Sequence, residues 1–175
     1  MRTLLPDPPP APFDELLEQR RRWGGDRFDE VWDGVLHMNP SPHRRHAYLQ
    51  AQLIEALAPL GRARGLTTVG EFNLGVREDF RVPDAALHSP GPDELYNSTA
   101  ALVIEIISAN DETWDKLGFY AIHQVQELLI VDPHQREVHW LSMAGQSYTP
   151  IERSRLIALG PAELAERIDW PPVEH

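Results

Sequence analysis

The chain has 175 residues, no cysteine and a formal net charge of −11, with 42% hydrophobic and 25% charged residues. The absence of cysteine excludes disulfides and thiolate metal sites, and no apolar run reaches the roughly 18–20 residues of a membrane helix. The acidic balance weighs against tight, non-specific binding to a polyanion, which requires a basic footprint. We expect a soluble globular protein of the cytoplasm that does not contact a membrane.

The N-terminal segment differs in composition from the rest of the chain. Residues 1–11 are rich in proline, and we expect a flexible tail that is too short for a signal sequence. Residues 12–175 have the length of one domain with a core of its own. Because no internal repeat and no long linker divides this part, we expect a single domain.

A helix and a hairpin are the first expected elements. Residues 13–22 carry an amphipathic pattern and end on three arginines, which are favourable at the C-terminal end of a helix. Apolar residues in the segments 28–32 and 35–38 flank Asp33-Gly34. An Asp-Gly pair in this setting is typical of a two-residue hairpin turn.

A longer helix and several strands are expected in the middle of the chain. Residues 66–76 predict one or two strands, and residues 81–87 predict a strand in which Pro83 causes a bulge or a missing ladder bond. The helix is expected over residues 43–60, with an apolar stripe. The stripe consists of Leu49, Leu53, Ile54, Leu57 and Leu60.

The most apolar strand is expected over residues 101–108, after a loop at residues 88–98. It is apolar on both faces, as in a central strand that is covered on both sides. Asp111 is expected to cap a helix that runs to about residue 125, and residues 127–131 predict the next strand. The buried stripe of this helix is expected to be Trp114, Leu117, Ala121 and Val125.

The C-terminal part predicts a last hairpin, from residues 137–141 and a strand near Tyr148, and a last helix from Pro161 to about Arg167. The alternation of helices and strands from residue 43 onward favours a mixed β-sheet flanked by helices, an α/β or α+β fold. The N-terminal helix and hairpin are additions to this sheet.

Two acids and one lysine are the strongest candidates for chemistry. Glu105 lies inside an apolar strand, where a carboxylate is costly unless it is paired or binds a metal. Asp84 follows Pro83 on the same framework, and Lys116 is the only lysine in the chain. Carboxylate oxygens suit Mg²⁺ or Mn²⁺ better than zinc. A lysine, unlike an arginine, can lose its proton. This set indicates metal-assisted hydrolysis.

Each of the three residues also has a purely structural interpretation. Asp84 could cap a turn at the end of a strand, and Glu105 could be a buried glutamate paired with an arginine. Lys116 could form a surface pair with Glu112, which stands four residues before it in the favourable order.

Further candidates carry weaker signals. His46 could contact a phosphate or assist proton transfer, or it could be a solvent-facing residue near a helix N-terminus. Arg44, Arg45 and Arg81 could contact phosphates, although runs of charge are usually solvated faces. Glu30 and Glu71 are possible additional acids, although Glu30 also fits a role in holding the hairpin.

Six motifs, taken in chain order, resemble the Uma2 family (DUF820) of restriction-endonuclease-like proteins, within the PD-(D/E)XK nuclease superfamily. The resemblance covers about residues 28–133. The motifs are Phe28–Gly34, Pro40-Ser41-Pro42 with His46, Arg81–Asp84, Val103–Ser108, Lys116–Tyr120 and Glu127–Pro133.

The resemblance implies a nuclease core at about residues 41–133 and a metal-dependent endonuclease that hydrolyses DNA. It implies that Asp84 and Glu105 hold Mg²⁺ or Mn²⁺, with the backbone carbonyl of Ile106 as a further ligand. In the superfamily pattern a lysine stands two residues after the glutamate, whereas this chain has Ile107 there. In Uma2-like sequences the lysine lies on the following helix, which Lys116 matches. The chain also departs from many relatives at Val35, where they have a glutamate.

A non-enzymatic interpretation stays open beside the nuclease. The same fold could serve as a catalytically inactive module that binds nucleic acid or a protein partner, and the acidic net charge and the displaced lysine favour it. A structural metal site without turnover is a third interpretation. A homodimer is also expected, in which the N-terminal tail and hairpin pack on a second copy.

Overall fold

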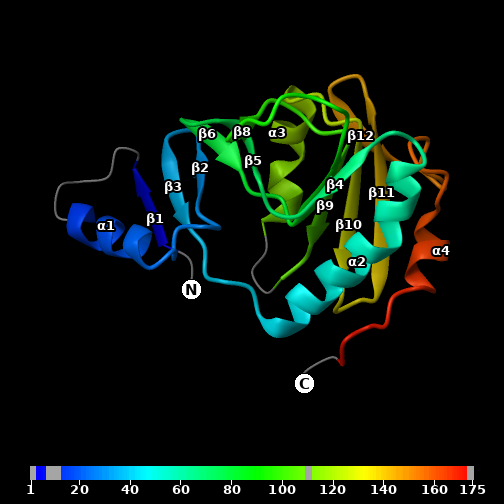
Figure 1. The fold of residues 1–175 in the computed structure, drawn as a ribbon, viewed down its shortest axis with the longest axis horizontal. Helices are drawn as coiled ribbons and strands as arrows, with labels where there is room; N and C mark the ends of the chain where they lie inside the picture. Colours follow the sequence, from blue (N-terminus) through cyan, green and yellow to red (C-terminus); the bar gives the residue numbers. More distant parts are fainter. Residues whose placement is uncertain (1–2, 7–12, 109–111, 173–175) are drawn as a thin grey trace.

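Two six-stranded sheets form the framework of the computed structural model, which describes residues 3–6, 13–108 and 112–172 (Figure 1). We call them the core sheet, in the order β12-β11-β10-β9-β7-β4, and the N-terminal sheet, in the order β1-β3-β2-β6-β5-β8. The core sheet contains β4 (Thr67–Val69), β7 (Ala85–His88), β9 (Leu102–Ile106), β10 (Glu127–Asp132), β11 (Glu137–Ala144) and β12 (Ser147–Pro150). The N-terminal sheet contains β1 (Thr3–Pro6), β2 (Glu30–Trp32), β3 (Val35–Met38), β5 (Asn73–Val76), β6 (Asp79–Arg81) and β8 (Tyr96–Asn97).

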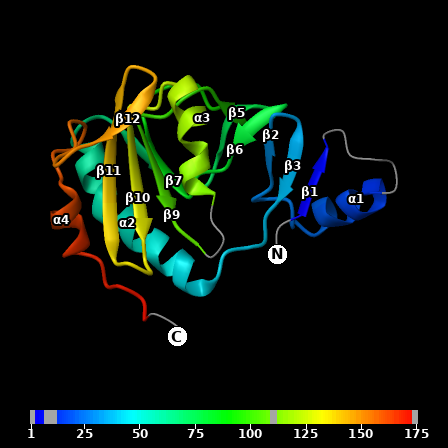
Figure 2. The ribbon, with the colours of Figure 1, turned by 180° about the vertical axis from the view of Figure 1, so that it is seen from behind.

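Helices cover both faces of the core sheet. On one face, α2 (Arg44–Arg62) packs through Leu49, Leu53 and Leu57, beside α4 (Pro161–Ala165). On the other face, α3 (Leu117–Ile122) packs through Phe119 and Tyr120. In Figure 1, α2 lies in front of the sheet, and in the reverse view of Figure 2, α3 lies in front of it. The expected mixed sheet with flanking helices is confirmed.

β9 is the central strand that the sequence predicted. It pairs in parallel with β10 and antiparallel with β7, and all five of its residues are buried. Because side chains alternate along a strand, Ile104 and Ile106 face α2 whereas Val103 faces α3. Glu105 shares the side of Val103 and is therefore directed toward α3 and the turn that precedes it.

The N-terminal sheet carries the expected hairpin and one unexpected strand. β2 and β3 are joined by Asp33-Gly34, both with positive φ (48° and 76°), as a tight hairpin turn requires. β1 pairs antiparallel with β3, so residues 3–6 are a strand rather than part of a flexible tail. α1 (Asp14–Arg22) packs its buried Leu17 against Met38.

The strand expected at residues 81–87 is divided between the two sheets. β6 ends at Arg81 in the N-terminal sheet, and β7 begins at Ala85 in the core sheet. The connecting residues, Val82 to Asp84, contain Pro83, which has no N–H for a ladder bond. The segment 66–76 is divided in the same way, into β4 and β5. The crossover at Val82 to Asp84 places Asp84 at the junction of the two sheets.

The helix expected from Asp111 to residue 125 is shorter and starts with a 3₁₀ turn. The turn, η2, spans Thr113–Lys116, and α3 follows it directly, whereas Asp111 lies outside the described residues. Trp114, expected to be buried, is 48% exposed, because the three-residue repeat of the 3₁₀ turn takes it off the stripe. It makes an edge contact with His139 instead.

The remaining expected helices and strands are present, with small shifts of their bounds. β11 and β12 form the last hairpin, and α4 begins at Pro161. The loop at residues 88–98 contains the short strand β8. No helix among the described residues is long and apolar enough to cross a membrane.

Candidate active site

Glu105 is a buried carboxylate with two charged or polar donors on one oxygen. It is 4% exposed, and its Oε1 accepts a hydrogen bond from Lys116 Nζ at 3.1 Å and a second from the Tyr120 hydroxyl. None of the described residues donates to Oε2. The pairing therefore involves a lysine and a tyrosine rather than the arginine of the structural interpretation.

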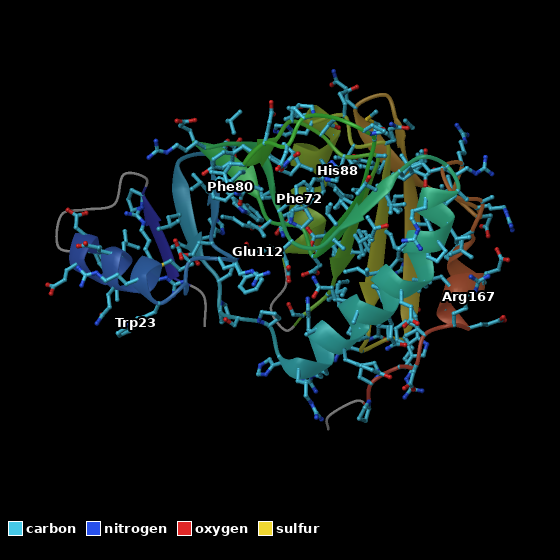
Figure 3. All side chains as sticks on the ribbon, viewed as in Figure 1. Trp23, Phe72, Phe80, His88, Glu112 and Arg167 are labelled. Atoms are coloured by element: carbon cyan, nitrogen blue, oxygen red, sulfur yellow. The ribbon has the colours of Figure 1, made fainter. Side chains whose placement is uncertain are left out.

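Lys116 brings a second carboxylate into the site. Its Nζ lies 2.9 Å from Glu30 Oε1, on a strand of the other sheet, and the side chain is 9% exposed. A surface pair with Glu112 is therefore wrong, and Glu112 Oε2 lies 3.4 Å from His37 Nδ1 instead. Figure 3 shows Glu112 between the N-terminal hairpin and the core of the protein.

Asp84 connects the crossover to β9 and α2. Its Oδ2 accepts the backbone N–H of Ile106 at 2.7 Å, and its Oδ1 lies 2.9 Å from Nε2 of His46 in the first turn of α2. Gln50, one turn further along α2, donates to the backbone carbonyl of Asp84 at 2.5 Å. The carboxylate thus stands one residue from Glu105 along β9, because Ile106 follows Glu105.

Burial and like charges shift the ionisation of this group of residues. Burial raises the pKa of Glu105 to about 7, and the nearby Asp84 and Glu30 add to the increase against the opposing effect of Lys116. Burial alone would lower the pKa of Lys116, but Glu105 and Glu30 outweigh it and raise that pKa well above its usual value. Burial and the same carboxylates raise the pKa of Tyr120.

Apart from Tyr120, these side chains line one cleft of 540 Å³ between the two sheets and the start of α2. It contains Asp84, Glu105 and Lys116, together with Ile106 and His46. Of the weaker candidates, Glu30 lies in the same cleft. The sequence therefore predicted six residues that the fold brings to a single cleft, from five different segments.

Arg81 does not lie in the cleft, and the expectation that it contacts substrate is wrong. It is 5% exposed, and its guanidinium stacks between the rings of Trp32 and Phe119, at 4.4 and 4.0 Å from their centroids. It also donates to the carbonyl of Val31 at 2.7 Å. Arg81 therefore holds the junction of β2 and β6.

Arg44 and Glu71 also lie outside the cleft lining. Arg44 is exposed, whereas Arg45, which was named with it, lines the cleft. Glu71 accepts a hydrogen bond from Gln50 at 3.0 Å and pairs with Arg27 at 3.2 Å. Burial opposes ionisation of Glu71, but these two partners lower its pKa overall. Glu71 supports the site only through Gln50.

A divalent cation fits the charge of the cleft. Glu30 and Glu105 contact the ammonium of Lys116, and Asp84 lines the same cleft, so negative charge is in excess in this part of the cleft. Within the ranges that the structure describes, no three His, Cys, Asp or Glu side chains are arranged to hold a metal. Asp84 and Glu105 are the two carboxylates of the cleft that could contribute to a cation site.

Sequence reasoning missed Tyr120 and Gln50. Tyr120 stands four residues after Lys116, so a helical turn brings both side chains to the same neighbour. That spacing was the available signal for Tyr120. For Gln50, nothing in the local sequence distinguishes a buried amide from an exposed one on α2.

Comparison with known proteins identifies relatives of this chain. A family model described as "Uma2: Putative restriction endonuclease" matches residues 13–165. A crystal structure of "a putative nuclease belonging to DUF820 from Anabaena variabilis ATCC 29413" has a TM-score of 0.66 and 15% identity, covering 79% of this chain and 90% of that one. This likeness shows the fold.

Two other results add little. The cryo-electron microscopy structure of a DrdV–DNA complex gives a TM-score of 0.40 at 15% identity, and the match covers 79% of this chain but only 11% of that one. No curated protein sequence matches the chain. The family match extends over most of the chain and agrees with the motifs and the fold, so this protein belongs to the Uma2 family.

Proposed function

We propose that this protein is a metal-dependent endonuclease that hydrolyses phosphodiester bonds of DNA in the cleft between its two sheets. The observation that carries the proposal is the meeting of Asp84, Glu105 and Lys116 in one cleft, although they lie on a crossover, a strand and a 3₁₀ turn. Membership in a family described as "Putative restriction endonuclease" supports the reaction class. DNA as the substrate rests on that family resemblance.

Each residue of the cleft has its own role in the proposed mechanism. Asp84 and Glu105 would hold Mg²⁺ or Mn²⁺, with the carbonyl of Ile106 as a further ligand. A bound cation would supply Lewis-acid stabilisation of the phosphate. The ammonium of Lys116, fixed within 3.1 Å of Glu105, would neutralise charge that develops on the phosphate and orient the attacking water. His46, held by Asp84, stands where it could contact a phosphate.

The burial of the site explains why a cation and an ammonium are both needed. Glu105 and Lys116 are almost fully buried, so charges there interact more strongly than they would in water. An incoming phosphate would add negative charge to a cleft that is already lined by four carboxylates. Binding of substrate is therefore expected to depend on the cation.

An inactive binding module is the second candidate, because the cleft offers few basic groups. Among its described lining residues, Arg45 and Lys116 are the arginine and lysine side chains, against Glu30, Asp84, Glu105 and Glu112. With a net charge of −11, the chain lacks an evident footprint for a polyanion. A homodimer or another partner that adds positive charge remains a prediction.

Calorimetric titration with Mg²⁺ and Mn²⁺, combined with plasmid nicking on the same samples, tests the proposal. Wild type should bind the cation and nick, whereas Glu105→Gln should lose binding. Glu105→Gln and Lys116→Met should both lose about 10²–10³-fold in nicking rate, the usual effect of removing one electrostatic contact to a transition state.

Glu127→Gln is the matched control for this experiment. Glu127 is also a buried glutamate of the core sheet but lies outside the cleft lining, so its variant should keep cation binding and nicking. Cation binding without nicking in wild type would favour the binding module. The absence of cation binding would reject the proposed mechanism.

A further inference from the structure

Glu30 differs from Glu105 in how its two carboxylate oxygens are used. It is 1% exposed, and its Oε1 accepts both Lys116 Nζ at 2.9 Å and the backbone N–H of Val82 at 2.8 Å. Its Oε2 accepts the indole N–H of Trp32 at 2.8 Å. With three donors in place, Glu30 is poorly available as a cation ligand, unlike Glu105, whose contacts all use one oxygen.

The three donors lie in three different segments of the chain. Lys116 is the candidate ammonium, on η2, and Val82 begins the crossover that carries Asp84 two residues later. Trp32 lies on the same strand as Glu30 and stacks on Arg81, the last residue before the crossover. One carboxylate of the N-terminal hairpin is therefore bonded to the elements that bear two of the three proposed catalytic residues.

Backbone pairing alone would not join these parts firmly. β2 and β6 share a single paired register position, Val31 with Phe80, before the chain leaves for the core sheet. The Glu30 side chain continues this contact by accepting the Val82 N–H, where the ladder has ended. Lys116 lies 86 residues further along the chain and has no backbone pairing to β2 that would fix its amine.

We propose that Glu30 is a positioning residue that fixes the amine of Lys116 and the Asp84 crossover relative to Glu105. The proposal rests on the nuclease function stated above, for which it assigns a role to the N-terminal hairpin. Without Glu30, the amine would have Glu105 as its one remaining carboxylate partner and would compete there with the cation. Loss of Glu30 would thus impair the site through Lys116.

The single lysine of the chain allows a test that does not require catalysis. In protein labelled with [¹³C,¹⁵N]lysine, the ammonium of Lys116 gives the only side-chain lysine signal, and its hydrogen exchange with water reports how firmly the group is held. Glu30→Gln should accelerate this exchange at least tenfold, whereas Glu127→Gln should leave it unchanged. An unchanged rate in Glu30→Gln, or equal acceleration in both variants, would overturn the proposal.

A double-mutant cycle on nicking then tests whether Glu30 acts through Lys116. In an otherwise wild-type protein, Glu30→Gln should lower kcat by about 10²-fold. In the Lys116→Met variant, the same substitution should lower kcat by no more than about twofold. Equal losses in both backgrounds would overturn the proposal. If wild type does not nick at all, the proposed function fails, while the exchange experiment still decides the role of Glu30.

Glu30→Asp keeps the test decisive if Glu30→Gln does not fold. Aspartate retains the charge but is one methylene shorter, so it cannot reach Lys116, Val82 and Trp32 together. The exchange rate of the Lys116 ammonium should then lie between wild type and the range expected for Glu30→Gln. An exchange rate equal to that of wild type would count against the proposal.

Discussion

Two buried glutamates on adjacent strands of the core sheet, Glu105 on β9 and Glu127 on β10, have opposite surroundings. Glu127 accepts only neutral donors: the Trp140 indole N–H at 2.9 Å, the Ser154 hydroxyl at 2.6 Å and the Arg155 backbone N–H at 2.8 Å. Glu105 is bonded to an ammonium and a phenol and has two further carboxylates near it.

The difference shows that burial of a carboxylate does not by itself indicate function. At Glu127, three hydrogen bonds satisfy both oxygens and attach residues 154–155 to the sheet, so the group stabilises the fold. At Glu105, repulsion from Glu30 and Asp84 adds to the cost of burial. A site of this kind is held together by the rest of the fold, and binding of a cation would stabilise it.

The largest effect expected from this contrast is a pH dependence of stability that arises from Glu105. Its pKa is about 7 in the folded protein against an ordinary value of 4.5. Between these values the folded state binds more protons, so its stability falls as pH rises through this window. At 1.36 kcal/mol per pKa unit, the loss is on the order of 3 kcal/mol. Urea unfolding of the metal-free protein between about pH 5 and pH 8 measures it.

Glu105→Gln is the control that assigns this slope to Glu105. The variant should lack the decrease that Glu105 contributes, and near pH 8 it should be more stable than wild type. Burial lowers the pKa of His88 below its ordinary value of 6.5, so this residue adds a slope of the opposite sign in both proteins, and the difference between the two slopes isolates Glu105. Lys116 does not contribute, because its pKa is raised from 10.5 and the stability it adds is lost only at more alkaline pH. Identical slopes in the two proteins would contradict the assignment.

The second expected effect has the opposite sign and concerns Glu127. Glu127→Gln should lower the free energy of unfolding by about 2 kcal/mol, because an amide N–H₂ would face donors that now meet a carboxylate. Chemical denaturation of the variant and wild type measures it. An increase in stability, as expected for Glu105→Gln, would show that the two glutamates are alike.

Sequence reasoning succeeded where a local pattern determines the structure. Asp33-Gly34 predicted the hairpin, and the apolar run around Glu105 predicted the central strand. The same run showed that Glu105 is a carboxylate in an apolar setting. Asp84 and Lys116 could be named because they belong to ordered motifs. Glu30 was noted only as a weak candidate, because its contact with Lys116 spans 86 residues and leaves no local pattern.

The errors have a common physical cause. Arg81 looked like a surface cation, but the stacking of two aromatic rings from different elements buries it. Trp114 looked like part of a helical stripe, but its turn is 3₁₀ and the helix begins at Leu117. In both cases, packing between elements decides the environment, and single-element periodicity cannot report it.

The smallest expected effect concerns the hydroxyl of Tyr120. It is a neutral hydrogen-bond donor to Glu105, and in this respect it resembles the donors to Glu127. Its hydrogen bond stabilises the ionised carboxylate and lowers the pKa of Glu105. Tyr120→Phe keeps the ring in its contact with Phe119 and removes this bond, so the pKa of Glu105 should rise further, by roughly one unit or less. Carbon-13 NMR of the glutamate carboxyl groups, assigned with Glu105→Gln, measures the shift in the metal-free protein.

In Tyr120→Phe, cation affinity near neutral pH should fall as the pKa of Glu105 rises, and it should recover at higher pH, because deprotonation of Glu105 precedes binding. A fall in the pKa would mean that Tyr120 acts on Glu105 mainly by excluding water, and Glu105 would then resemble Glu127 less than its hydrogen bonds indicate.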